Sequence, residues 1–123
     1  MPERMLVIDD APVIRSFLEE VLRDMGFEVD VAENGRDGFE LAKKRDYAII
    51  FCDVHMPILN GLQTVIAIKK LKPESRIVMT DSFPDRQAEQ AARAGAYCCL
   101  TKPFDLEELK SIIANALKVK AVR

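Results

Sequence analysis

The chain has 123 residues, 49% of them hydrophobic and 31% charged, and its 18 basic and 20 acidic side chains give a net charge of −2. This composition predicts one globular domain over residues 1–123 and argues against a disordered chain. The chain has no basic excess typical of a nucleic-acid-binding surface, no apolar run near the roughly 18 residues of a membrane span, and no signal peptide.

The first two elements are a short strand and a long helix. The apolar run 5–8 predicts a strand that stops at two acids. Apolar residues spaced at i and i+4 then predict a helix over 13–25, with Pro12 suited to its first turn and Gly26 to the residue after its end. Its wide apolar face comprises Val13, Ile14, Phe17, Leu18, Val21, Leu22 and Met25.

Two strands and a short helix follow. Residues 28–32 alternate apolar and polar side chains, as in an edge strand. Asn34 can cap a short helix that carries Phe39 and Leu41. The run 47–52 is continuously apolar, which predicts a central strand covered on both faces, and it too stops at an acid, Asp53.

The next elements repeat the alternation of helix and strand. Residues 56–61 have the composition of a loop, and a helix is predicted over 62–71, ending before a proline. The run 76–79 predicts the fourth strand, which ends at Thr80.

The last part of the chain contains a helix, a strand and a final helix. An alanine-rich helix is predicted over 88–94, and a fifth strand over 96–100. The final helix starts at a capping box formed by Asp105 and Glu108. Its apolar face comprises Leu106, Leu109, Ile112, Ile113, Ala116 and Leu117.

Five strands alternating with five helices predict an α/β fold with a doubly wound parallel sheet. Ligands of such folds bind at the carboxyl ends of the strands. The side chains that the predicted strands bring to this edge are Asp9, Asp10, Asp53, Thr80 and Lys102.

This set of side chains has a definite chemistry. Three neighbouring carboxylates repel one another, so the cluster must take up protons or hold a cation, and hard oxygen ligands suit Mg²⁺. Lys102 can bind a phosphoryl group as a point charge, and Thr80 can donate from its hydroxyl. The remaining carboxylate can act as a nucleophile and form an aspartyl phosphate.

In these motifs the chain resembles the response-regulator receiver domain of two-component signalling. The residues that carry the resemblance are Asp9-Asp10, Asp53-Val-His-Met-Pro57 with Gly61, Thr80, and Lys102-Pro103. The resemblance covers essentially the whole chain. It implies the flavodoxin-like strand order 2-1-3-4-5.

The resemblance also implies a role for each site residue. Asp53 matches the phospho-acceptor, Asp10 a direct Mg²⁺ ligand, and Asp9 a ligand acting mainly through water. The backbone carbonyl of His55 would be a further ligand, and Mn²⁺ or another divalent ion could replace Mg²⁺. Thr80 and Lys102 would contact the phosphoryl group. Lys102-Pro103 would be a cis peptide, and Tyr97 matches an aromatic whose rotamer follows phosphorylation.

The implied function is a phosphorylation-controlled switch in the cytoplasm, not a turnover enzyme. The partners would be a sensor histidine kinase or a phosphotransfer protein, and an effector that reads the fourth helix, fifth strand and fifth helix. A homodimer on phosphorylation is compatible with this function. No direct contact with nucleic acid or membrane is expected.

Two residues depart from the family pattern or are particular to this chain. Asp81 follows Thr80 where the family usually has a small residue, and it can either add a fourth carboxylate or cap the next helix. His55 occupies a variable position. We expect both to alter rates and not the chemistry.

Other readings of the same residues remain open. Asp9 and Asp10 can cap the first helix, and Tyr97 can be an ordinary half-buried tyrosine. The chain could be an interaction module that works without phosphate, or a phosphatase with an aspartyl-phosphate intermediate. Many such phosphatases have a second acid two residues after the nucleophile, where this chain has His55.

The chain has three cysteines. Cys52, Cys98 and Cys99 lie in apolar stretches without C-x-x-C spacing, which predicts buried thiols in a reducing compartment. Adjacent residues of a strand point to opposite faces, which disfavours a bridge between Cys98 and Cys99. A zinc site built on several histidines is excluded because the chain has one.

Overall fold

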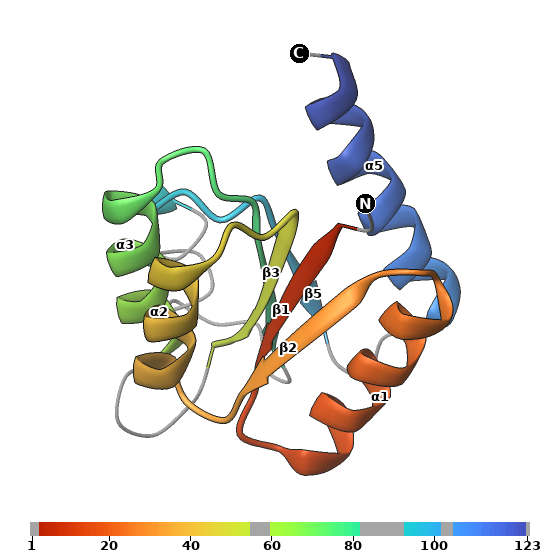
Figure 1. Ribbon diagram of the computed structural model, residues 1–123, viewed down its shortest axis with the longest axis horizontal. Helices are drawn as coiled ribbons and strands as arrows, with labels where there is room; N and C mark the ends of the chain where they lie inside the picture. Colours follow the sequence, from red (N-terminus) through yellow and green to blue (C-terminus); the bar gives the residue numbers. More distant parts are fainter. Residues whose placement is uncertain (1–2, 55–59, 82–92, 102–104, 123) are drawn as a thin grey trace.

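A parallel sheet of five strands lies between two layers of helices (Figure 1). The computed structural model describes residues 3–54, 60–81, 93–101 and 105–122. Its elements are β1 Arg4–Ile8, α1 Pro12–Asp24, β2 Glu28–Ala32, α2 Gly35–Lys44, β3 Ile49–Asp53, α3 Gly61–Leu71, β4 Ile77–Asp81, β5 Cys98–Thr101 and α5 Leu106–Val122.

The strand order is β2-β1-β3-β4-β5, and every pair is parallel. This order confirms the predicted topology. The helix predicted over 88–94 falls almost entirely outside the described residues, which contain four helices. None of the helices in the described ranges has the length and apolar character needed to cross a bilayer.

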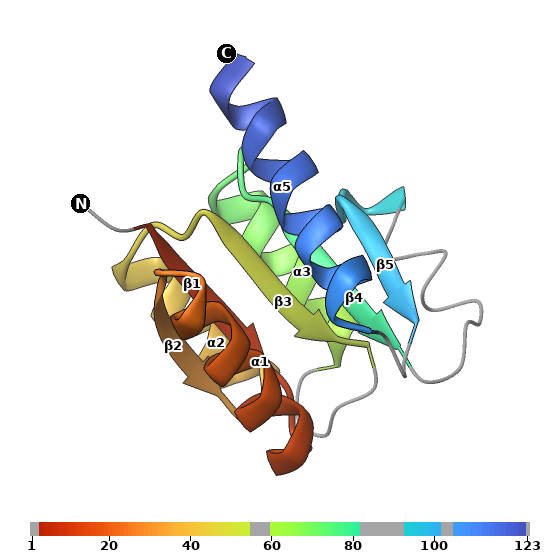
Figure 2. The same ribbon diagram turned by 90° about the vertical axis from the view of Figure 1, so that its right-hand side faces the viewer.

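Alternate residues of the central strands fill two separate cores. Ile50 and Cys52 face α2 and α3, whereas Ile49 and Phe51 face α1 and α5. Figure 2 shows the sheet with α1 and α5 on one side and α2 and α3 on the other. Because β3 is covered on both faces, all five of its residues are buried, as its continuous apolar run predicts.

The predicted helix ends are confirmed where the structure describes them. Asn34 accepts a hydrogen bond from the Asp37 amide at 2.8 Å, and Asp105 accepts one from the Glu108 amide at 2.7 Å. Gly26 follows the C-terminus of α1 with a φ of 96°, in the left-handed region that favours glycine. A further capping box, which the sequence analysis missed, starts α3 at Asn60.

The predicted apolar face of α1 is wider than the face that the sheet covers. Leu18 and Leu22 are buried, but Val13 is 79% exposed and Phe17 is also exposed. The predicted apolar face is thus not covered over its whole width, because a helix resting on a flat sheet buries only the stripe nearest to it. Leu106 of α5 is exposed for the same reason, while Leu109, Ile113 and Ala116 are buried.

The prediction of three buried thiols holds for only one of them. Cys52 is fully buried, and burial together with the charges of Asp53 and Asp9 raises the pKa of its thiol. Cys98 is half-buried, and burial raises its thiol pKa too. Cys99 is exposed. The reason is that β5 is an edge strand whose two faces are not equally covered.

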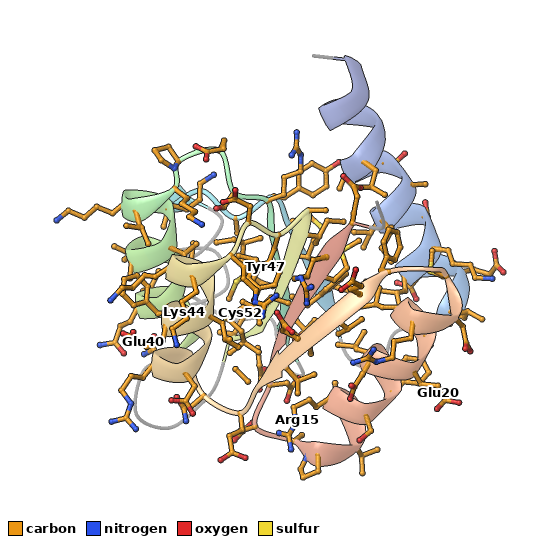
Figure 3. The ribbon with its side chains drawn as sticks, viewed as in Figure 1. Arg15, Glu20, Glu40, Lys44, Tyr47 and Cys52 are labelled. Carbon is orange, nitrogen blue, oxygen red and sulfur yellow. The ribbon has the colours of Figure 1, made fainter. Side chains whose placement is uncertain are left out.

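The central strand starts two residues later than predicted. Tyr47 precedes β3, and its hydroxyl donates to Asp30 of β2 at 2.7 Å. Partial burial and this hydrogen bond raise the pKa of the Tyr47 phenol. Figure 3 shows Tyr47 lying over the sheet. An apolar run alone does not separate a strand residue from one that packs against the start of the strand.

Candidate phosphoryl-acceptor site

The site begins with the register of three parallel strands. Asp53 at the end of β3 is the Cα partner of Thr80 in β4, and Ile8 of β1 is paired with Cys52. Because side chains alternate along a strand, Asp9, Asp53 and Thr80 continue the rows that face α1 and α5. The structure therefore brings these three predicted residues to one edge of the sheet.

All three of these side chains are buried. Asp53 is 5% exposed, and Asp9 and Thr80 are each 1% exposed. Asp10, the next residue after Asp9, is exposed. Oxygen atoms of Asp9, Asp10 and Asp53 all lie within 4.8 Å of one another. The sequence prediction that two adjacent acids and a distant third converge is confirmed.

The electrostatics of this cluster favour a cation. Two carboxylates about 5 Å apart repel by about 3 kcal/mol at an effective dielectric of 20. A divalent ion with hard oxygen ligands offsets this repulsion, and three carboxylate oxygens at this separation can reach one ion. The residues thus fit a Mg²⁺ site by their chemistry and by their spacing.

Hydrogen bonds to three other described residues hold Asp9 in place. Its amide donates to the Ala32 carbonyl at 3.0 Å, and its carboxylate accepts from the Ala11 amide at 2.9 Å. The Arg15 guanidinium donates to its carbonyl at 2.8 Å. The carboxylate thus fixes Ala11, the residue before α1, and also belongs to the acidic cluster. The N-cap of α1 is Ala11 and no side chain caps this helix, so the alternative of Asp9 or Asp10 as a helix cap is wrong.

Asp53 is positioned by the chain that follows it. The Val54 amide donates to the Thr80 carbonyl at 2.9 Å, and the Gly61 amide donates to the Val54 carbonyl at 2.8 Å. A Cβ atom at residue 61 would lie 2.5 Å from the Asp53 carbonyl oxygen and 2.5 Å from the Val54 Cα. Only glycine lets α3 start this close to the strand end that carries Asp53.

Tyr97 does not join the site. Its amide donates to the Ile77 carbonyl at 2.7 Å, whereas the residue paired with Thr80 is Leu100. Tyr97 lies three positions before Leu100, about 10 Å toward the amino-terminal edge of the sheet. Tyr97 is 39% exposed there, at a cavity of about 190 Å³. This placement argues against the switch role that the resemblance implied.

The remaining predicted site residues lie wholly or partly outside the part of the chain that the structure describes. His55, Lys102 and Pro103 lie outside the described residues, so their roles and the cis peptide stay predictions. Asp81 ends β4 and pairs with Thr101, but its side chain is also outside the described part. Whether it adds to the acidic cluster stays a prediction too.

Sequence reasoning missed one charged side chain at this edge. Arg15 lies on α1 and contacts the backbone of Asp9. The available signal was its spacing, six residues after Asp9, because a long side chain in the first turn of a helix can reach back to the preceding strand end.

Comparison with known protein families identifies the family to which this chain belongs. The family model of the response regulator receiver domain matches residues 5–114. The chain belongs to the response regulator receiver domain family. It is a phosphorylation-dependent switch module of two-component response regulators.

Individual relatives agree with this assignment. The chemotaxis protein CheY of Halobacterium salinarum is 30% identical over 118 residues, which cover 95% of this chain and 98% of that protein. The receiver domain spans only 26–57% of the length of four other regulators that it matches. In those proteins the matched part is thus one portion of a longer chain.

Solved structures share the fold. A response regulator receiver domain protein from Clostridium thermocellum has a TM-score of 0.91 and 28% identity, with 98% of each chain covered. The response regulator TrrA of Thermotoga maritima, solved in complex with Mg²⁺ and BeF, has a TM-score of 0.85 and 31% identity. That match covers 93% of this chain and 98% of TrrA.

Proposed function

We propose that this receiver domain accepts a phosphoryl group on Asp53 from a phosphohistidine donor, in a reaction that requires Mg²⁺. The observation that carries the proposal is the cluster of Asp53 with Asp9 and Asp10, whose oxygens lie within 4.8 Å of one another at the carboxyl edge of the sheet. TrrA, which is 31% identical to this chain, was solved in complex with Mg²⁺ and BeF, and this supports divalent-cation binding by the domain.

Each site residue has a distinct role in the proposed phosphoryl transfer. A carboxylate oxygen of Asp53 attacks phosphorus, the P–N bond of the donor breaks, and Asp53 becomes an acyl phosphate. Asp9, Asp10 and Asp53 would hold Mg²⁺, which when bound neutralises charge on the phosphoryl oxygens. The Thr80 hydroxyl, next to Asp53 in the register, donates to one such oxygen. Lys102 is proposed to bind another.

The proposed outcome of phosphorylation is a change of conformation. The dianion on Asp53 draws Thr80 and Lys102 inward and biases a two-state surface. We propose that an effector reads a surface that includes β5, α5 and the helix predicted over 88–94, and that the donor is a histidine kinase or a phosphotransfer protein. On this proposal the domain promotes its own phosphorylation and dephosphorylation, and it is not a turnover enzyme for an external substrate.

Phosphoramidate tests the proposal because it supplies a P–N donor without a kinase. Incubation with phosphoramidate and Mg²⁺ is expected to add the mass of one phosphoryl group to the intact protein, and chelation of the metal is expected to prevent it. No mass gain in Mg²⁺ would favour an interaction module that works without phosphate. Continuous release of inorganic phosphate with fast turnover would favour the phosphatase reading.

The two adjacent acids should differ in their contribution to Mg²⁺ binding. The Asp9 carboxylate is buried and accepts from the Ala11 amide, whereas the Asp10 carboxylate is exposed and can turn toward the ion. We expect Asp10→Asn to weaken Mg²⁺ binding about tenfold, and Asp9→Asn about threefold. A Mg²⁺ titration followed by NMR amide shifts measures both constants.

The matched control is Glu20→Gln, which removes one negative charge from the exposed face of α1. Figure 3 shows Glu20 pointing away from the sheet. This variant should bind Mg²⁺ as the wild type does. A wild-type constant in Asp10→Asn would remove Asp10 from the proposed ligand set.

A further inference from the structure

A basic side chain lies beside the acidic cluster without pairing to it. Arg15 Nη1 donates to the backbone carbonyl of Asp9 at 2.8 Å, and within the described residues Arg15 forms no ion pair. Figure 3 shows Arg15 extending from α1 toward the segment that joins β1 to the helix. The guanidinium thus contacts the backbone of the segment that carries Asp9 and Asp10, and not a carboxylate of the cluster.

The contact between Arg15 and Asp9 helps to hold the segment between β1 and α1 in place. The Asp9 amide is bound to β2 through the Ala32 carbonyl, and the Asp9 carboxylate is bound to the Ala11 amide. Arg15 holds the remaining polar group of the Asp9 backbone. Asp10 is exposed, so few packing contacts orient its side chain. The direction in which this side chain leaves the backbone is set by the contacts that fix Asp9.

We propose that Arg15 is a positioning residue for the divalent-cation site: it fixes the backbone at Asp9 so that Asp9 and Asp10 already converge with Asp53 before the ion binds. The inference rests on the proposed function, because it concerns the same site. A site that is ordered in advance loses less conformational freedom on binding, and groups that orient metal ligands are known to strengthen affinity.

The charge of Arg15 and its position act in opposite directions. Its positive charge repels Mg²⁺, so loss of the charge alone would tighten binding. Loss of the hydrogen bond to Asp9 would weaken binding. The two effects separate at high salt, because at 0.5 M ionic strength the Debye length falls to about 4 Å and the repulsion is largely screened.

The experiment is a Mg²⁺ titration in 0.5 M KCl, followed by NMR amide shifts. Arg15→Met is expected to raise the Mg²⁺ dissociation constant about threefold to tenfold. Arg15→Gln has a shorter side chain that cannot reach the same carbonyl, so it should raise the dissociation constant by a similar factor. This second variant provides the test if Arg15→Met folds poorly. Arg15→Lys keeps a donor on a long side chain and should restore most of the affinity.

Arg23 provides a matched control on the same helix. Arg23 Nη2 also donates to a strand carbonyl, that of Val29 at 3.0 Å, but near the opposite end of α1. Arg23→Met therefore removes a helix-to-sheet contact of the same kind, together with an ion pair to Glu19, and should leave Mg²⁺ affinity unchanged. Hydrogen exchange of the Ala11 amide should speed up in metal-free Arg15→Met and not in Arg23→Met.

The outcomes distinguish this inference from the proposed function. If Arg15→Met and Arg15→Gln bind Mg²⁺ as tightly as the wild type, or more tightly, Arg15 does not position the site. Equal losses of affinity in Arg15→Met and Arg23→Met would also overturn the inference, since the effect would then be general destabilisation. If the wild type itself does not bind Mg²⁺, the proposed function fails.

Discussion

Replacing Asp53 with Asn is expected to abolish phosphoryl transfer from phosphoramidate and to stabilise the metal-free protein. The first effect follows from loss of the nucleophilic carboxylate. The second follows from repulsion: Asp53 is buried within 4.8 Å of Asp9 and Asp10 oxygens, so removal of one charge should raise the free energy of unfolding by about 1–3 kcal/mol.

Thermal melts and intact mass measure the two effects of Asp53→Asn separately. For a domain of this size the stabilisation corresponds to roughly 3–5 °C in Tm per kcal/mol. The gain should shrink in millimolar Mg²⁺, because the ion stabilises the wild type more than the variant. Glu20→Gln removes the same charge far from the cluster and should change the free energy of unfolding by less than about 0.5 kcal/mol. A variant less stable than wild type without metal would contradict the repulsive cluster.

Replacing Gly61 with Ala is expected to be strongly destabilising although the change adds one methyl group. The new Cβ would lie 2.5 Å from the Asp53 carbonyl oxygen and from the Val54 Cα, both of which are backbone atoms that no rotamer change can move away. Overpacking of this kind costs about 2–3 kcal/mol. To relieve the clash, the backbone at Asp53 and Val54 must shift. This shift displaces the Asp53 carboxylate, so the extent of phosphorylation by phosphoramidate should fall as well.

Gly38 offers a comparison for the same substitution. The nearest atoms to a Cβ at Gly38 would belong to the fully buried side chain of Ile8 and not to the backbone. Gly38→Ala should therefore also lower stability, but without a clash against the backbone that carries Asp53. Urea unfolding of Gly61→Ala and Gly38→Ala, with phosphoramidate labelling of each folded variant, separates loss of stability from displacement of Asp53. Wild-type labelling and stability in Gly61→Ala would show that the start of α3 does not position Asp53.

Local patterns in the sequence determined the elements and the edge at which the acids meet. Short apolar runs that stop at Asp9 and Asp53 predict strands with polar carboxyl ends, and the parallel topology then brings those ends together. The caps at Asn34 and Asp105 were also predictable, because a cap is a contact between residues three apart in the chain.

The tertiary structure alone decided which apolar residues are covered and which backbone atoms come close. Val13 and Leu22 both belong to the wide apolar face predicted for α1, but only Leu22 rests on the sheet. Tyr97 lies in an apolar run beside Cys98, yet the register places it at the far edge from Thr80.

The contacts of Gly61 with Asp53 and of Arg15 with Asp9 depend on how helices approach strand ends. Periodicity fixes the face of a helix. The distance and angle at which the helix meets the sheet come from packing of the whole core, which no local pattern encodes.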